Sequence, residues 1–243
     1  YSLLESLFKA QASRQGQGYY AKDYLNALAH PLVKNLKLFQ DPALTRVLVH
    51  KVEEALTGKV ATNLSGSLFV APKSVAQERL LFEAALQTAK KMELCATYDE
   101  LKDTLALLNR VLFTSWEKVT SLEELAAALQ ELLSLLVEKS PLTSYPLNLA
   151  MADKLFAVGE ELAQASFSRE KFSQEELFKI LQNKLENERI AFSGSPLKGL
   201  QVLGLFESRS LNFENVIILD ANEAALPNLK IYEPLIPREV MIT

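Results

Sequence analysis

The sequence holds very little of the chemistry from which reactive and metal-binding sites are built. Its 243 residues contain one cysteine, Cys95, and two histidines, His30 and His50. A single cysteine excludes an internal disulfide and suits a reducing compartment, so we expect a cytoplasmic protein. Structural zinc sites use more Cys and His ligands than these three residues can supply. We therefore expect no metal site and no disulfide scaffold.

Several longer signals are also missing. The start, Tyr1-Ser-Leu-Leu-Glu5, lacks the basic residues and apolar run of a signal peptide, and no apolar span of about 18 residues is present. We expect no membrane association. No phosphate-binding loop of the form GxxxxGK[ST] occurs, so we expect no complete nucleotide site and no cofactor. The chain begins without Met and stops at Met241-Ile-Thr243, and we expect both ends to be cut from a longer protein.

The composition favours a folded, soluble domain. Apolar residues make up 49% of the chain, which is enough for a sizeable core. The 26 basic and 30 acidic residues give a formal charge of −4. A sequence-independent DNA clamp is normally basic, so this balance argues weakly against one.

Apolar spacing predicts helix after helix over the first four-fifths of the chain. Helices are expected over residues 3–8, 22–29, 42–56, 122–136, 147–165 and 175–188. Pro31 either ends the second of these or opens another helix towards residue 39. Residues 59–73 predict a loop with a short extended piece. Hydroxyl residues followed three positions later by Glu or Gln predict capping boxes at Ser74, Thr97, Ser121 and Ser173.

The pattern changes after residues 192–196. Two short apolar runs, 201–206 and 216–219, predict buried strands joined by a short connection, as in a parallel sheet. The partner strands that they need are not in the sequence. We therefore expect a mainly α fold, with a multi-helical domain over 1–192 and a short strand–turn–strand segment within a second domain over 197–243.

Isolated candidates for chemistry have structural explanations. His30, before Pro31, is expected to cap a helix end, and His50 to lie at the surface. Cys95 is expected to be a small buried hydrophobe, because no His lies near it in the sequence. Glu100-Leu-Lys102 fits half of a nuclease metal site, but Glu100 is already explained as a cap, so no catalytic residue is assigned.

A stretch near the N-terminus interleaves basic and aromatic residues. Such a pattern can follow a nucleic-acid backbone and stack bases, but a solvated helical face with aromatic core anchors is the favoured explanation. The residues are Lys22, Lys34, Lys37, Arg46, Lys51 and Lys59, with Tyr19, Tyr20 and Tyr24.

The most informative segment is 196–227. Gln201 leads an apolar run, and Glu207-Ser208-Arg209, Leu211-Asn212-Phe213, a second apolar run, Asn222-Glu223 and Pro227 follow it. This order resembles motif V of UvrD-like (superfamily 1) helicases. It is more similar to the degenerate motif of AddB-like helicase–exonucleases, which end in a PD-(D/E)XK nuclease domain. Residues 20–33 are also similar to a segment of these proteins.

The resemblance implies a helicase lobe that keeps its backbone fold but no longer couples ATP to movement along DNA. Positions that hold Thr, His, Lys-Gly and Glu in active helicases hold Gly204, Phe206, Arg209-Ser210 and Asn212 here. Only the basic turn keeps its character, so coupling to ATP is in doubt. The candidate nucleic-acid or coupling residues are Gln201, Gly204, Glu207, Arg209, Asn212, Asn222 and Glu223.

The resemblance also implies a layout and a role. Residues 1–192 correspond to the helical accessory domain called 2B, and 197–243 to part of the second RecA-like lobe, which carries motif V. The expected function is that of a non-catalytic internal domain of a DNA-repair nuclease that processes double-strand breaks. DNA, reached through the parent protein, and a second helicase–nuclease subunit are the expected partners. The alternative is an all-helical protein-interaction module, which the leucine stripe of residues 122–136 supports.

Overall fold

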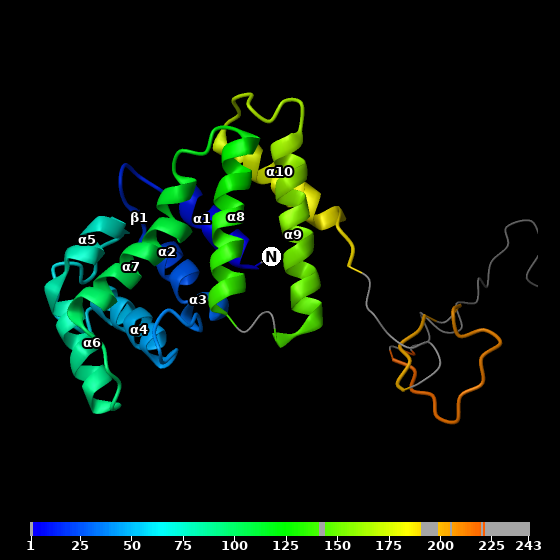
Figure 1. Ribbon diagram of the computed structural model, residues 1–243, viewed down its shortest axis with the longest axis horizontal. Coiled ribbons are helices and arrows are strands. Elements are labelled where there is room, and N and C mark those ends of the chain that lie inside the picture. Colours follow the sequence, from blue (N-terminus) through cyan, green and yellow to red (C-terminus); the bar gives the residue numbers. More distant parts are fainter. Residues whose placement is uncertain (1, 141–143, 191–198, 205, 220, 222–243) are drawn as a thin grey trace, which may run out of the picture. The chain divides into compact units, whose positions relative to one another are not determined.

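Helices form nearly all of the regular structure in the described part of this chain, so the predicted mainly α fold is confirmed (Figure 1). The computed structural model describes residues 2–140, 144–190, 199–204, 206–219 and 221. In chain order the helices are α1 Ser2–Ala12, α2 Ala21–Leu28, α3 Pro31–Lys34, α4 Ala43–Thr57, α5 Pro72–Gln77, α6 Arg79–Lys91, α7 Tyr98–Leu112, the 3₁₀ turn η1 Thr114–Trp116, α8 Leu122–Lys139, α9 Pro146–Gln164 and α10 Gln174–Asn187.

The sheet of the described chain is small and lies among the N-terminal helices. Strands β1 (Tyr19–Tyr20) and β2 (Phe69–Val70) pair antiparallel, with Tyr19 opposite Val70. The extended piece expected within residues 59–73 is therefore present. By its internal contacts the chain divides into two units, Tyr1–Phe192 and Ser193–Thr243.

Side-chain caps define several helix starts. Thr97 and Ser173 form the expected capping boxes, in which each hydroxyl accepts from a backbone N–H and the Glu carboxylate accepts in return. Ser121 caps α8, but the Glu124 carboxylate accepts from the backbone N–H of Thr120 instead, at 2.7 Å. The expectation at Ser74 is wrong. Pro72 starts α5 two residues earlier because its fixed φ suits a first turn.

The leucines of α8 belong to the core of the helical unit. α8 lies side by side with α9, as Figure 1 shows, and its apolar face is buried. The stripe that supported a protein-interaction module is therefore used internally. Its buried residues are Leu122, Leu125, Leu129, Leu132, Leu133 and Leu136.

A buried hydrogen-bonded chain joins three helices on the other side of this unit. The Tyr24 hydroxyl of α2 donates to Oδ1 of Asn109 in α7 at 2.8 Å, and Nδ2 of Asn109 donates to the carbonyl of Pro72 in α5 at 3.2 Å. The Tyr24 ring also stacks on Phe113, with centroids 4.6 Å apart. Burial raises the pKa of the Tyr24 hydroxyl, so it remains a donor at every physiological pH.

Removing the Tyr24 hydroxyl is expected to destabilise the fold. Tyr24→Phe keeps the ring but leaves Oδ1 of Asn109 without its donor in the core, which should lower the free energy of unfolding by about 1–3 kcal/mol. Tyr145→Phe is the matched control, because Tyr145 is 62% exposed. Urea unfolding monitored by circular dichroism measures both variants. Equal stability of Tyr24→Phe and wild type would contradict the assigned role.

The predicted strands near the C-terminus are the main error of the sequence prediction. Residues 201–204 and 216–219 form no β-ladder, and their side chains are largely exposed, with Val202 at 89% and Ile217 at 84%. A turn over residues 206–210 lies between them. A buried parallel strand needs neighbours on both edges, and the described residues supply none.

Hydrogen exchange should reflect this difference between the two units. Amides of residues 201–204 and 211–219, which lack ladder hydrogen bonds, are expected to exchange within seconds. Amides in the middle of α8 should exchange many orders of magnitude more slowly. Mass spectrometry of the full chain after deuterium labelling measures both. Protection of the C-terminal segment equal to that of α8, in a monomer, would show that strands form in solution.

Candidate functional site

The turn over residues 206–210 brings three of the predicted site residues together. Backbone hydrogen bonds from Ser208 N–H to the Gly204 carbonyl, at 3.2 Å, and from Leu211 N–H to the Ser208 carbonyl, at 3.2 Å, shape the turn. Ser210 has a positive φ of 63°, which reverses the chain direction at its end. Gly204, Glu207 and Arg209 therefore share one short loop.

Arg209 is held by an aromatic ring. Its guanidinium carbon lies 4.6 Å from the centroid of the Phe206 ring, within the range of a cation–π contact. Among the described residues Glu207 makes no ion pair with Arg209. The Glu207 carboxylate instead lies against the Cα of Gly204, where a Cβ would overlap it. Arg209 therefore keeps an exposed, charged fork that is free to meet an anion.

The other predicted site residues do not join this turn. Gln201 precedes it and is half-buried, and Asn212 follows it with its side chain exposed. Asn222 and Glu223 lie outside the described residues. The described site is thus a short turn that carries the exposed Arg209.

The two histidines have structural environments, as predicted. Nδ1 of His30 accepts from the Leu32 N–H at 3.3 Å and so caps α3, while Nε2 lies 3.0 Å from the Ser2 hydroxyl. Burial lowers the pKa of His30, which favours the neutral ring that this cap requires. His50 is exposed and lies within 3.5 Å of the Glu53 carboxylate.

Cys95 does not have the environment that was predicted. It is exposed, because it lies in the connection between α6 and α7 rather than on a buried helical face. Glu93, with a positive φ of 59°, turns the chain there. Cys95 borders a broad hollow of about 1050 Å³, which is also lined by Phe39 and Leu94.

Two of the three tyrosines among the N-terminal basic residues are core anchors, whereas Tyr20 is half-buried beside the Phe69 ring. Tyr19 and Tyr24 are fully buried, so neither can stack on a base. The Tyr19 hydroxyl donates to the Glu117 carboxylate at 2.9 Å. Of the two explanations for this stretch, the described structure favours a solvated helical face.

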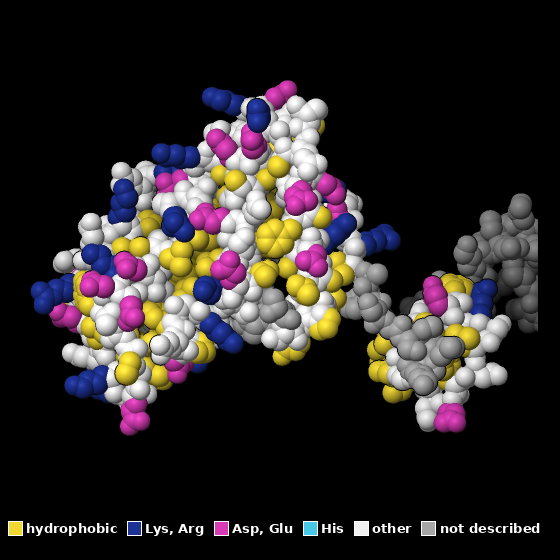
Figure 2. Space-filling view, viewed as in Figure 1, with side chains coloured by type: hydrophobic (Ala, Val, Ile, Leu, Met, Phe, Trp, Pro, Cys, Tyr) yellow, Lys and Arg dark blue, Asp and Glu magenta, His cyan; other side chains and the backbone are white. Residues whose placement is uncertain are grey.

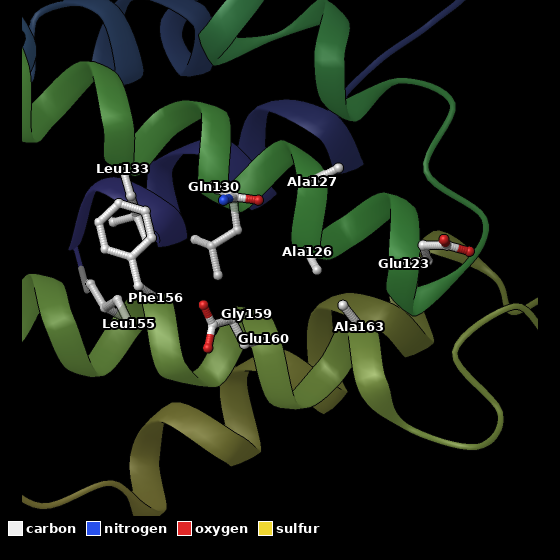
Figure 3. A pocket seen from close by; sticks show the side chains of 11 residues that line it. Glu123, Ala126, Ala127, Gln130, Leu133, Leu155, Phe156, Gly159, Glu160 and Ala163 are labelled. Carbon is white, nitrogen blue, oxygen red and sulfur yellow. The ribbon is translucent and has the colours of Figure 1, made fainter.

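A shallow groove between α8 and α9 was not predicted (Figure 3). Its volume is about 230 Å³, and Gln130 from α8 and Glu160 from α9 border it. Its floor is formed by small and apolar side chains, namely Ala126, Ala127, Leu129, Leu133, Leu155, Phe156, Gly159 and Ala163. The only sequence signal for it is the set of small residues at helical spacing on both helices.

The described residues hold neither a metal-binding cluster nor a membrane-spanning helix. Within them, no three His, Cys, Asp or Glu side chains are arranged to hold a metal ion. None of the described helices has the length and apolar character to cross a bilayer. Comparison with protein-family models, curated proteins and solved structures finds no match for the chain.

Arg209→Ala is expected to weaken binding of the full chain to duplex DNA. The logarithm of the association constant falls linearly with the logarithm of the salt concentration. Loss of one phosphate contact should make this slope shallower by about one unit, with little dependence on DNA sequence. Arg169→Ala is the control, because Arg169 is also exposed but is paired with Glu123. Fluorescence anisotropy at several salt concentrations measures the slope. An unchanged slope with a lower melting temperature would make Arg209 a purely structural residue.

Proposed function

We propose that this chain is a non-catalytic helical domain of a helicase-like DNA-repair nuclease of the double-strand-break-processing type. It serves there as a scaffold and as a guide for DNA. A further helicase–nuclease subunit is the expected protein partner. The exposed apolar side chains of the segment that resembles motif V are the observation that carries this proposal.

That exposure is unusual for a segment with such a sequence. Val202, Ile217 and Leu219 are each more than four-fifths exposed, and both apolar runs are affected. Burial of apolar area stabilises by about 25 cal/mol per Å², so such runs favour a partner surface. Strands of a RecA-like lobe would provide that surface on both edges of each run.

The turn between the two runs supports a scaffold rather than a motor. Arg209 keeps a basic side chain where active relatives have a basic turn, whereas Gly204 and Asn212 lack the groups that couple ATP to movement. A lost donor or acceptor usually removes its interaction outright. DNA can therefore still be held near this turn without being driven by it.

A protein-interaction module is the second candidate, and the groove between α8 and α9 favours it. The groove is apolar at its floor and polar at Gln130 and Glu160, a pattern that suits an amphipathic helix. The leucine stripe of α8 no longer contributes to this argument because it is buried.

Survival after DNA breakage tests the proposed function. An in-frame deletion of the segment that encodes residues 1–243 should make cells of the source organism sensitive to ionising radiation, and the intact gene should restore survival. Heat shock serves as the control stress and should affect both strains equally. Radiation survival equal to that of the parent strain would refute a role in break repair and leave the interaction module.

A further inference from the structure

Three separate parts of the helical unit meet at the C-terminal end of α3. The Arg46 guanidinium of α4 donates to Oδ1 of Asn35 at 3.3 Å, and the Thr45 hydroxyl donates to the Leu36 carbonyl at 2.8 Å. The Lys37 N–H donates to the carbonyl of Lys139, the last residue of α8. Residues that are about 100 positions apart are thereby fixed next to one another.

This junction gathers positive charge. Lys37, Arg46 and Lys139 are exposed, and Lys34 ends α3 directly before them. Figure 2 shows Lys and Arg side chains lying together where α3 meets the lower end of α8. We call Lys34, Lys37, Arg46 and Lys139 the basic junction.

No described ion pair neutralises the cations of the basic junction. Among the described residues, none of its four cations has a carboxylate within ion-pair distance. Elsewhere many basic side chains are paired, as in Arg14–Glu117, Lys51–Glu54, Arg79–Glu83, Arg110–Glu131, Lys154–Glu188 and Lys184–Glu161.

Two carboxylates adjoin the junction along the chain, and three more, Glu93, Glu100 and Asp103, line the hollow that Leu38 and Phe39 border. Asp41 lies in the connection to α4, and its Oδ1 already accepts from the Ala43 N–H at 2.7 Å. Glu138 is the neighbour of Lys139 in the chain and is exposed. Because none of these acids forms a described ion pair with the junction, its four side chains keep their charge available on a chain whose net charge is −4.

Arg46 is also held in place before any ligand arrives. The Asn35 amide that accepts from it donates in turn to the Pro31 carbonyl at 2.8 Å. Nη1 of Arg46 is therefore held by the Asn35 side chain. The remaining guanidinium N–H groups can bind phosphate oxygens. Such preorganisation lowers the entropy lost when a ligand binds.

We infer that the basic junction binds the phosphate backbone of duplex DNA. The choice of DNA over another polyanion rests on the proposed function. The basic junction is made of Lys and Arg side chains, which bind phosphate oxygens, so the contact is made to the DNA backbone. Binding at this surface is therefore independent of DNA sequence and steeply dependent on salt.

Neutralisation of the basic junction in the full chain tests this inference. The variant carries Lys34→Gln, Lys37→Gln, Arg46→Gln and Lys139→Gln. The control variant carries Lys90→Gln, Lys91→Gln, Lys102→Gln and Lys118→Gln, which removes the same charge from exposed lysines that have no ion pair among the described residues. Fluorescence anisotropy with two fluorescein-labelled duplexes of unrelated sequence measures affinity between about 50 and 200 mM salt.

The junction variant should bind at least tenfold more weakly than the control, with a salt slope lower by about two to four units for both duplexes. A third variant with Lys34→Arg, Lys37→Arg and Lys139→Arg should retain binding, which separates charge from folding. Equal affinity of the junction and control variants would overturn the inference, as would absence of DNA binding by the wild-type chain. Binding of poly-glutamate but not of DNA would also overturn it. Radiation survival reports separately on the proposed function.

Discussion

The side-chain amide of Asn109 is the constraint on which much of the helical unit depends. Its oxygen accepts from Tyr24 and its nitrogen donates to the Pro72 carbonyl, so a single buried group fixes α2, α5 and α7 together. A buried amide that loses either partner costs about 1–3 kcal/mol, so these helices cannot shift independently. Phe113, stacked on Tyr24 at the end of α7, also contacts the Tyr19 ring, with centroids 5.1 Å apart.

Local signals predicted the helical part of the fold well. Thr97 and Ser173 act on backbone groups within their own first turn, so the sequence pattern alone decides those caps. His30 caps α3 for the same reason. The error at Ser74 also has a local cause, because Pro72 competes for the start of the same helix and its fixed φ favours the earlier position.

Burial could not be predicted where it depends on parts of the chain that are distant in sequence. The apolar run from Val216 to Leu219 has the composition of a buried strand, but a strand forms only when other strands pair with it. The position of Cys95 depends on where α6 ends. Of the candidate site, the sequence predicted the basic turn, whereas the contact of Arg209 with Phe206 depends on how the turn closes.

The exposed position of Cys95 has a practical consequence. It is the only thiol in the sequence, so a maleimide dye would attach to the chain at a single known point between α6 and α7. Energy transfer from that dye to an acceptor at either end of a bound duplex would differ with the direction in which the duplex lies. The chain thus carries, without any substitution, a single attachment point for distance measurements on its helical unit.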